Sequence, residues 1–117
     1  MRTIIEFIER PGDLPLLRLY VHGAPHRRQH REVISRYRKE LVEAAKAAKI
    51  KIPITTPIAV SVLFIDPTSG DLDNLITALW RAIDGKASSG LTVLSDDELI
   101  FSIERTAKFY PAGNPVR

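Results

Sequence analysis

The sequence predicts a small α+β domain in which a mixed β-sheet carries two main helices. Runs of β-branched residues alternate with two segments of helical apolar spacing, and the most apolar run lies near the middle of the chain. The 117 residues match the length of one ordinary domain. We therefore expect a single domain over residues 1–110 and a C-terminal tail over residues 111–117.

The chain is expected to begin with two strands. Residues 3–9 are rich in β-branched side chains, and residues 16–21 form a second short apolar run. Between them, residues 10–13 read Arg-Pro-Gly-Asp, a composition typical of a turn. The chain is therefore expected to start with a strand, a turn and a second strand.

Residues 26–49 predict a basic helix. Apolar side chains recur at spacings of three and four and fall on one face, namely Ile34, Tyr37, Leu41, Ala44, Ala45 and Ala48. The basic side chains that we expect to contact a polyanion lie mostly off that face: Arg27, Arg28, Arg31, Arg38 and Lys39. The portion before Glu32 could instead be an extended basic arm.

The second half of the chain supplies the central strand and the second helix. Residues 58–65 are apolar at nearly every position, as in a strand covered on both faces. Residues 71–84 form an amphipathic helix with Gly85 at its end, because leucines and isoleucines recur along one stripe. Residues 91–94 predict a short strand, and residues 99–109 a last strand.

Composition restricts the chemistry. There are no cysteines, which excludes disulfide frameworks, thiolate zinc sites and cysteine nucleophiles. Residues 1–51 hold 12 Lys/Arg against 6 Asp/Glu, whereas residues 52–117 hold 5 against 8. A basic half and an acidic half indicate one part that holds a polyanion and another that holds a cation. No signal-peptide core and no membrane-length apolar run is present, so we expect a soluble, cytoplasmic protein without a membrane partner.

Four carboxylates stand out in this basic chain, at Asp71, Asp73, Asp96 and Asp97. Like charges that are brought together must be hydrated, protonated or bridged by a cation. On a helical wheel Asp73 projects from the polar side, and Asp71 lies at the start of the helix. Oxygen-only ligation favours Mg²⁺, with Mn²⁺ as a substitute. The alternative is that the Asp-x-Asp-Asn motif is only a helix cap and turn.

The aspartate pair follows an apolar β-like run. Consecutive residues of a strand point to opposite sides, so we expect one of the pair to reach the ion and the other to be its neighbour. This alternation by itself leaves open whether that residue is Asp96 or Asp97.

From about Ile58 to Lys108 the chain resembles the RusA family of Holliday junction resolvases. The resemblance is carried by Asp71-Leu72-Asp73-Asn74-Leu75, by the helix that ends at Gly85, and by Asp96-Asp97 before a β-rich run. It implies a RusA-like homodimer, in a bacterial or phage-infected cell, that makes paired Mg²⁺-dependent nicks in four-way DNA junctions. The carboxylate ligands that it implies are Asp71, Asp73 and Asp97.

Two positions of the second helix depart from the family pattern. Thr77 stands where the family usually has a lysine that is important for cutting, and Arg81 stands where it often has Asp. Because these residues are one helical turn apart, we hypothesise that Arg81 supplies the missing cation near the scissile phosphate. Lys108 matches the region of a family basic residue and is expected to contact DNA, although it could be an exposed lysine on an edge strand.

Two other functions stay open at this point. The same fold could serve as a metal-dependent nuclease for flaps or other branched DNA. A chain of another class, a non-catalytic DNA-binding module, would use its carboxylates only for capping and solubility.

Overall fold

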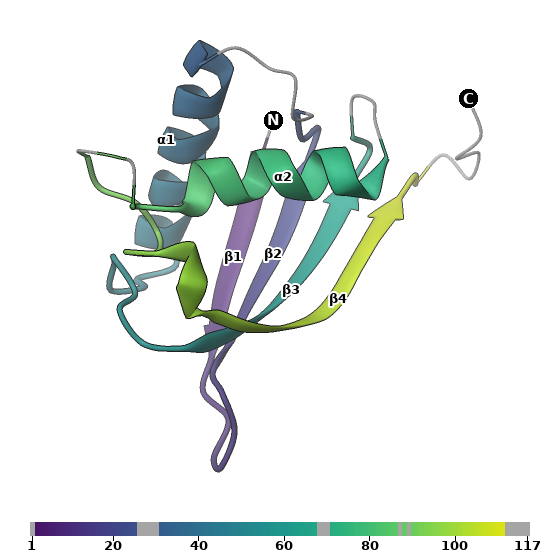
Figure 1. Cartoon of the computed structure of the whole chain (residues 1–117). Helices are drawn as coiled ribbons and strands as arrows, with labels where there is room; N and C mark the ends of the chain where they lie inside the picture. Colours follow the sequence, from purple (N-terminus) through teal and green to yellow (C-terminus); the bar gives the residue numbers. More distant parts are fainter. Residues whose placement is uncertain (1, 26–30, 68–70, 87, 89, 112–117) are drawn as a thin grey trace.

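The computed structural model describes residues 2–25, 31–67, 71–86, 88 and 90–111. It contains a four-stranded sheet and two α-helices in the order β1 (Arg2–Ile8), β2 (Leu16–His22), α1 (Arg31–Ala47), β3 (Ile58–Ile65), α2 (Leu72–Ile83) and β4 (Ile100–Phe109). A short 3₁₀ turn, η1 (Asp97–Leu99), precedes β4. The predicted α+β class with a mixed sheet and two helices is confirmed (Figure 1).

The sheet has the strand order β1-β2-β3-β4. β1 and β2 form an antiparallel hairpin, while β3 runs parallel to both β2 and β4. Parallel neighbours need a crossover connection, and α1 and α2 supply the two crossovers. Both helices cover the same face of the sheet, with α2 crossing in front of the strands (Figure 1).

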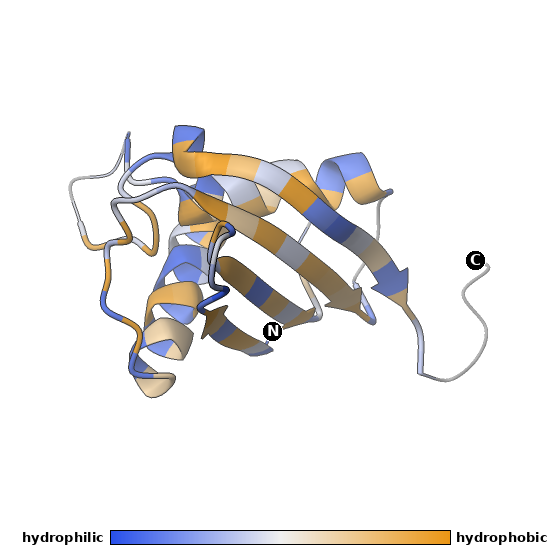
Figure 2. Cartoon of the chain, turned by 90° about the horizontal axis from the view of Figure 1, so that it is seen from below, coloured by the Kyte–Doolittle hydropathy of each residue, from blue (hydrophilic) through white to orange (hydrophobic). Residues whose placement is uncertain are grey.

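The core lies between the helices and the two central strands. Its fully buried side chains come from all the layers and include Leu17, Leu19, Tyr37, Leu41, Phe64, Leu75 and Leu79. Burial raises the pKa of the Tyr37 hydroxyl, so this group stays protonated at physiological pH. Apolar colour dominates the central strands in Figure 2, as expected for strands that are covered by helices.

β4 is one of the two edge strands of the sheet. Phe101 is 67% exposed and Ile103 is 49% exposed, although both are apolar. The strand is anchored at its middle, where the Glu104 carboxylate receives two hydrogen bonds from the Arg10 guanidinium at 2.8 and 3.0 Å. Within the described residues, neither helix has the combined length and apolar character needed to cross a membrane.

The first helix and the short strand near residue 91 differ from those expected, and part of the expected tail cannot be compared. The helix expected over residues 26–49 is described from Arg31 to Ala47, and residues 26–30 lie outside the described residues. The short strand expected over residues 91–94 is reduced to isolated bridges of Leu94 with Ile54 and Asp84. Of the expected tail, residues 112–117 also lie outside the described residues.

A candidate metal centre at the C-terminal end of α2

The N-terminal end of α2 uses its aspartates for local structure. Asp71 is the N-cap, and its side chain accepts a hydrogen bond of 3.1 Å from the Asn74 backbone N–H. Asp73 is exposed in the first turn, where the positive end of the helix dipole favours a negative charge. The Thr77 hydroxyl donates a 2.8 Å hydrogen bond to the backbone carbonyl of Asp73. The cap that the sequence allowed as an alternative is therefore present.

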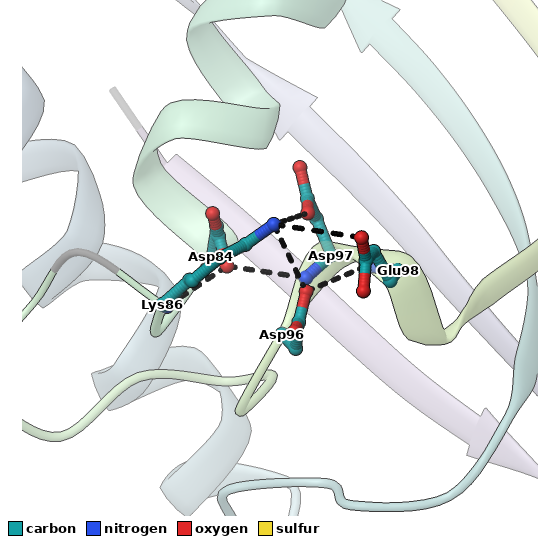
Figure 3. A network of polar contacts seen from close by, with 5 residues as sticks. All are labelled: Asp84, Lys86, Asp96, Asp97 and Glu98. Carbon is teal, nitrogen blue, oxygen red and sulfur yellow. Dashed lines mark hydrogen bonds and ion pairs between the residues drawn. The ribbon is translucent and has the colours of Figure 1, made fainter.

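A denser carboxylate group lies at the opposite end of the helix. One oxygen each of Asp84, Asp96 and Asp97 lies within 4.8 Å of the others, and all three residues are half-buried. Among the described residues this is the group of ligand-type side chains that could hold a metal ion. We call these three residues the aspartate cluster (Figure 3).

Backbone N–H groups hold the aspartate cluster in place. The Asp84 carboxylate accepts from the backbone N–H of Lys86 at 2.9 Å and from that of Asp97 at 3.1 Å. The Asp96 carboxylate caps η1 and accepts from the Glu98 N–H at 2.9 Å. The cluster thus joins the end of one helix to the start of a turn 12 residues later.

The Lys86 ammonium lies between the carboxylates. Its Nζ atom is 3.4 Å from an Asp96 oxygen, 3.5 Å from an Asp97 oxygen and 4.0 Å from a Glu98 oxygen (Figure 3). The nearby carboxylates, Asp96 foremost, raise the pKa of Lys86. The pKa of Asp96 is lowered, first by the hydrogen bond from the Glu98 backbone and then by Lys86. Lys86 and a divalent cation would compete for the same oxygen atoms.

Gly85 allows the two halves of the site to approach. A Cβ atom at this position would meet the Thr92 hydroxyl and would lie 2.7 Å from the Leu94 carbonyl oxygen and 3.0 Å from that of Ser95. The sequence placed Gly85 at the helix stop, and the helix does end at Ile83. The glycine is needed there for close packing of α2 against the segment that leads to Asp96.

The structure does not bring the sequence-predicted ligands together within one chain. α2 has 12 residues, so at about 1.5 Å per residue its ends lie about 18 Å apart. Asp71 and Asp73 lie at one end, whereas Asp97 lies in the aspartate cluster at the other. Asp84 was not predicted as a partner of Asp97, although Gly85 was expected to mark the end of the helix next to it.

The expected alternation of the aspartate pair is wrong. Asp96 and Asp97 both contribute an oxygen to the cluster, because Asp96 caps a 3₁₀ turn and Asp97 begins it. A turn does not send successive side chains to opposite sides, as a strand does. Lys86 was also missed, because nothing in the local pattern of a small-residue loop indicates a partner about ten residues away.

Three of the predicted basic residues meet in one cleft. Arg31 and Arg38 from α1 face Arg81 from α2 across a space of about 630 Å³, which is also lined by Ile34, Ser35, Asp84 and Ser88. We call this space the arginine cleft. Lys39 is exposed on α1 outside the cleft lining. Arg27 and Arg28 lie outside the described residues.

Lys108 lies far along the edge strand. It pairs with Phe64 of β3, and partners in parallel strands project to the same side of the sheet, so Lys108 projects to the side that carries the helices. Its side chain is exposed. This position is compatible both with a DNA contact and with a solvated edge lysine.

The three carboxylates of the aspartate cluster could hold a metal ion. Carboxylate oxygens suit Mg²⁺ or Mn²⁺ and are poor ligands for softer metals. Comparisons with protein-family models, with curated proteins and with solved structures gave no match to this chain. The resemblance to the RusA family therefore stands on the sequence motifs alone.

Proposed function

We propose that the protein is a Mg²⁺-dependent endonuclease that cuts four-way DNA junctions by paired nicks. The single observation that carries the proposal is the position of the aspartate cluster, which shares Asp84 with the lining of the arginine cleft. Carboxylates that can hold a divalent ion and guanidinium groups that can hold phosphate are thus adjacent. The sequence motifs that resemble those of the RusA family favour branched DNA as the substrate.

In the proposed site the acidic residues and the basic residues have different roles. Asp84, Asp96 and Asp97 would hold the ion, which when bound activates water and stabilises the leaving oxygen of a phosphodiester. Arginines near the cluster would neutralise the DNA backbone, and Arg81 is the one carried by the same helix as Asp84. Asp71 and Asp73, which the resemblance implies as ligands, lie at the other end of α2 and are not part of this proposed site.

The proposed assembly is a homodimer. Two identical sites related by a two-fold axis match a junction with two equivalent strands, so each subunit would nick one of them. This part of the proposal comes from the resemblance. An analytical ultracentrifugation run on the free chain and on its junction complex tests it.

The test of function measures cleavage of three synthetic substrates: a four-way junction, a flap and a linear duplex. Each is incubated with Mg²⁺, with Mn²⁺ and with EDTA. Symmetric, metal-dependent nicks in the junction alone support the proposal. Preferential cutting of the flap moves the activity to other branched DNA, and binding of all three without any cleavage contradicts a nuclease.

One observation favours the non-catalytic alternative. Lys86 already neutralises part of the aspartate cluster, so these carboxylates could serve to position a loop without an ion. In that case DNA binding would be insensitive to EDTA and to Asp97→Asn. The cleavage test separates this module from an enzyme.

A further inference from the structure

The arginine cleft combines features that point to a specific anion. Its lining includes three arginines, Arg31, Arg38 and Arg81, against one acidic residue, Asp84. Guanidinium groups present N–H donors in a fork that matches phosphate oxygens. Two neutral polar residues, Ser35 and Ser88, complete the polar part of the lining.

Arg38 is held in place by the helix that it faces. One of its terminal nitrogens donates a 2.8 Å hydrogen bond to the backbone carbonyl of Arg81, in the last turn of α2. Its Nε atom is buried and has no hydrogen-bond partner among the described residues. The hydrogen bond to the Arg81 carbonyl restricts the guanidinium of Arg38, so that an anion in the cleft would meet a group whose position is already fixed.

Asp84 connects this cleft to the aspartate cluster. It lines the cleft with the arginines, and its carboxylate also lies within 4.8 Å of ligand oxygens of Asp96 and Asp97. An anion in the cleft would therefore lie next to the cation that the cluster could hold. One carboxylate among three arginines leaves this lining with an excess of positive charge, so the cleft can attract an anion whether or not a cation is bound to the cluster.

We propose that the arginine cleft is a subsite for one phosphodiester group of the DNA backbone, which it places beside the aspartate cluster at the C-terminal end of α2. This inference rests on the proposed action on DNA and adds to it a defined contact made by Arg31, Arg38 and Arg81. The remaining exposed basic residues of α1, such as Arg36, lie outside the cleft lining and contribute only general charge.

The experiment measures the affinity of the full chain for a fluorescently labelled four-way junction in EDTA, as a function of salt. The variants are Arg31→Gln and Arg81→Gln, each checked for unchanged thermal unfolding. Arg36→Gln is the matched control, since it removes the same charge from an exposed position of the same helix. Arg38→Lys keeps the charge and a donor for the Arg81 carbonyl but loses the fork.

We expect each cleft variant, Arg38→Lys included, to raise the dissociation constant about tenfold. Arg31→Gln and Arg81→Gln should also lower the slope of log affinity against log salt by about one, as for the loss of one phosphate contact. Arg36→Gln should bind nearly as the wild type does. An equal loss in Arg36→Gln, or wild-type binding by the cleft variants, overturns the inference.

The two proposals fail in different ways. If the wild-type chain cuts junctions and the cleft variants bind like the wild type, the cleft inference is wrong and the nuclease stands. If the cleft variants lose binding but the wild type never cuts with Mg²⁺, the nuclease is wrong and the cleft inference is supported. A wild-type chain that binds no DNA in EDTA overturns the cleft as a DNA site.

Discussion

The two ends of α2 both carry aspartates, but the helix itself explains only one of these groups. At the N-terminal end, Asp71 caps the helix and Asp73 complements the positive end of its dipole. At the C-terminal end, Asp84 meets the negative end of the dipole, where a carboxylate is unfavourable. Helix stability therefore accounts for the first group and opposes the second.

The second group is nevertheless maintained by considerable local structure. Two backbone N–H groups and the Lys86 ammonium compensate its charge, and a glycine allows the chain to approach. Carboxylates that are kept together against their electrostatic preference are stronger candidates for a site than carboxylates that cap a helix. Asp84 is therefore a stronger candidate for a site residue than Asp73.

The largest expected effect is on the rate of DNA cleavage, and it distinguishes the two ends of α2. Asp97→Asn removes a residue that belongs both to the ligand set implied by the sequence and to the aspartate cluster, so it should lower metal-dependent cutting about a hundredfold. Asp84→Asn should do the same if the C-terminal end holds the ion. The readouts are the rate of junction cleavage and Mn²⁺ binding by calorimetry.

Asp73→Asn is the matched variant at the other end of the helix. If it abolishes Mn²⁺ binding while Asp84→Asn retains it, the metal site belongs to the N-terminal end. In that case the assignment of the metal site to Asp84 is wrong.

A second prediction concerns the close approach at Gly85. Gly85→Ala places a methyl group against backbone oxygens that cannot move independently, so it should lower the free energy of unfolding by about 2 kcal/mol. Gly90→Ala is the control, since the nearest atom to its Cβ would be the Ser88 hydroxyl at 4.0 Å. Urea unfolding measures both, and equal stability of the two variants would contradict the packing argument.

A third prediction tests the structural role of the N-terminal end. Asp71→Ala removes the acceptor for the Asn74 N–H and should lower the free energy of unfolding by about 1 kcal/mol. Asp71→Asn keeps an oxygen in place and should recover most of that loss. A cap role is refuted if Asp71→Ala is as stable as the wild type by urea unfolding.

The smallest expected effect is a change in the pKa of Asp96, which lies near the C-terminal end of α2. Lys86→Met should raise the pKa of Asp96 towards its ordinary value, yet leave it below that value, because the Glu98 N–H is the larger cause of the shift. Carbon-detected NMR titration of the Asp96 carboxyl measures this change. A pKa that does not move shows that Lys86 does not act on Asp96 in solution.

The sign of the pH dependence follows from the same shift. The pKa of Asp96 is lower in the folded chain than in the unfolded chain. Its contribution to stability is therefore fully present above the unfolded value of about 3.9 and is lost as the pH falls through the folded value. Mn²⁺ binding to the cluster should weaken over the same acidic range.

Much of the fold could be predicted because it depends on local periodicity. β3 was expected over residues 58–65 and is observed as Ile58–Ile65, and α2 differs from its expected range only by its capping residues. The cap at Asp71 was also foreseen, since it depends on residues three positions apart. Patterns of this range are readable from the sequence.

The aspartate cluster could not be predicted in the same way. Asp84 and Asp97 meet because Leu94 bridges the end of α2 and the connector at Ile54, and such tertiary contacts leave no periodic signal. The apolar run before them predicts strand geometry for Asp96 and Asp97, whereas the 3₁₀ turn there brings both carboxylates into the cluster. The position of Lys86 depends on that same turn.

The bridges of Leu94 also determine where this chain can be altered without harm. The Leu94 N–H donates to the Ile83 carbonyl at 3.2 Å, and the Ser95 N–H donates to the Ile54 carbonyl at 3.1 Å. The chain that starts after Gly85 is thus fixed again before it reaches Asp96. Extra residues inserted at the exposed Gly90–Leu91 position would lengthen a loop whose two ends are already held, at an entropic cost of about 0.6 kcal/mol per doubling of its length. This position is suited to a fluorescent tag that reports on the cluster without entering it.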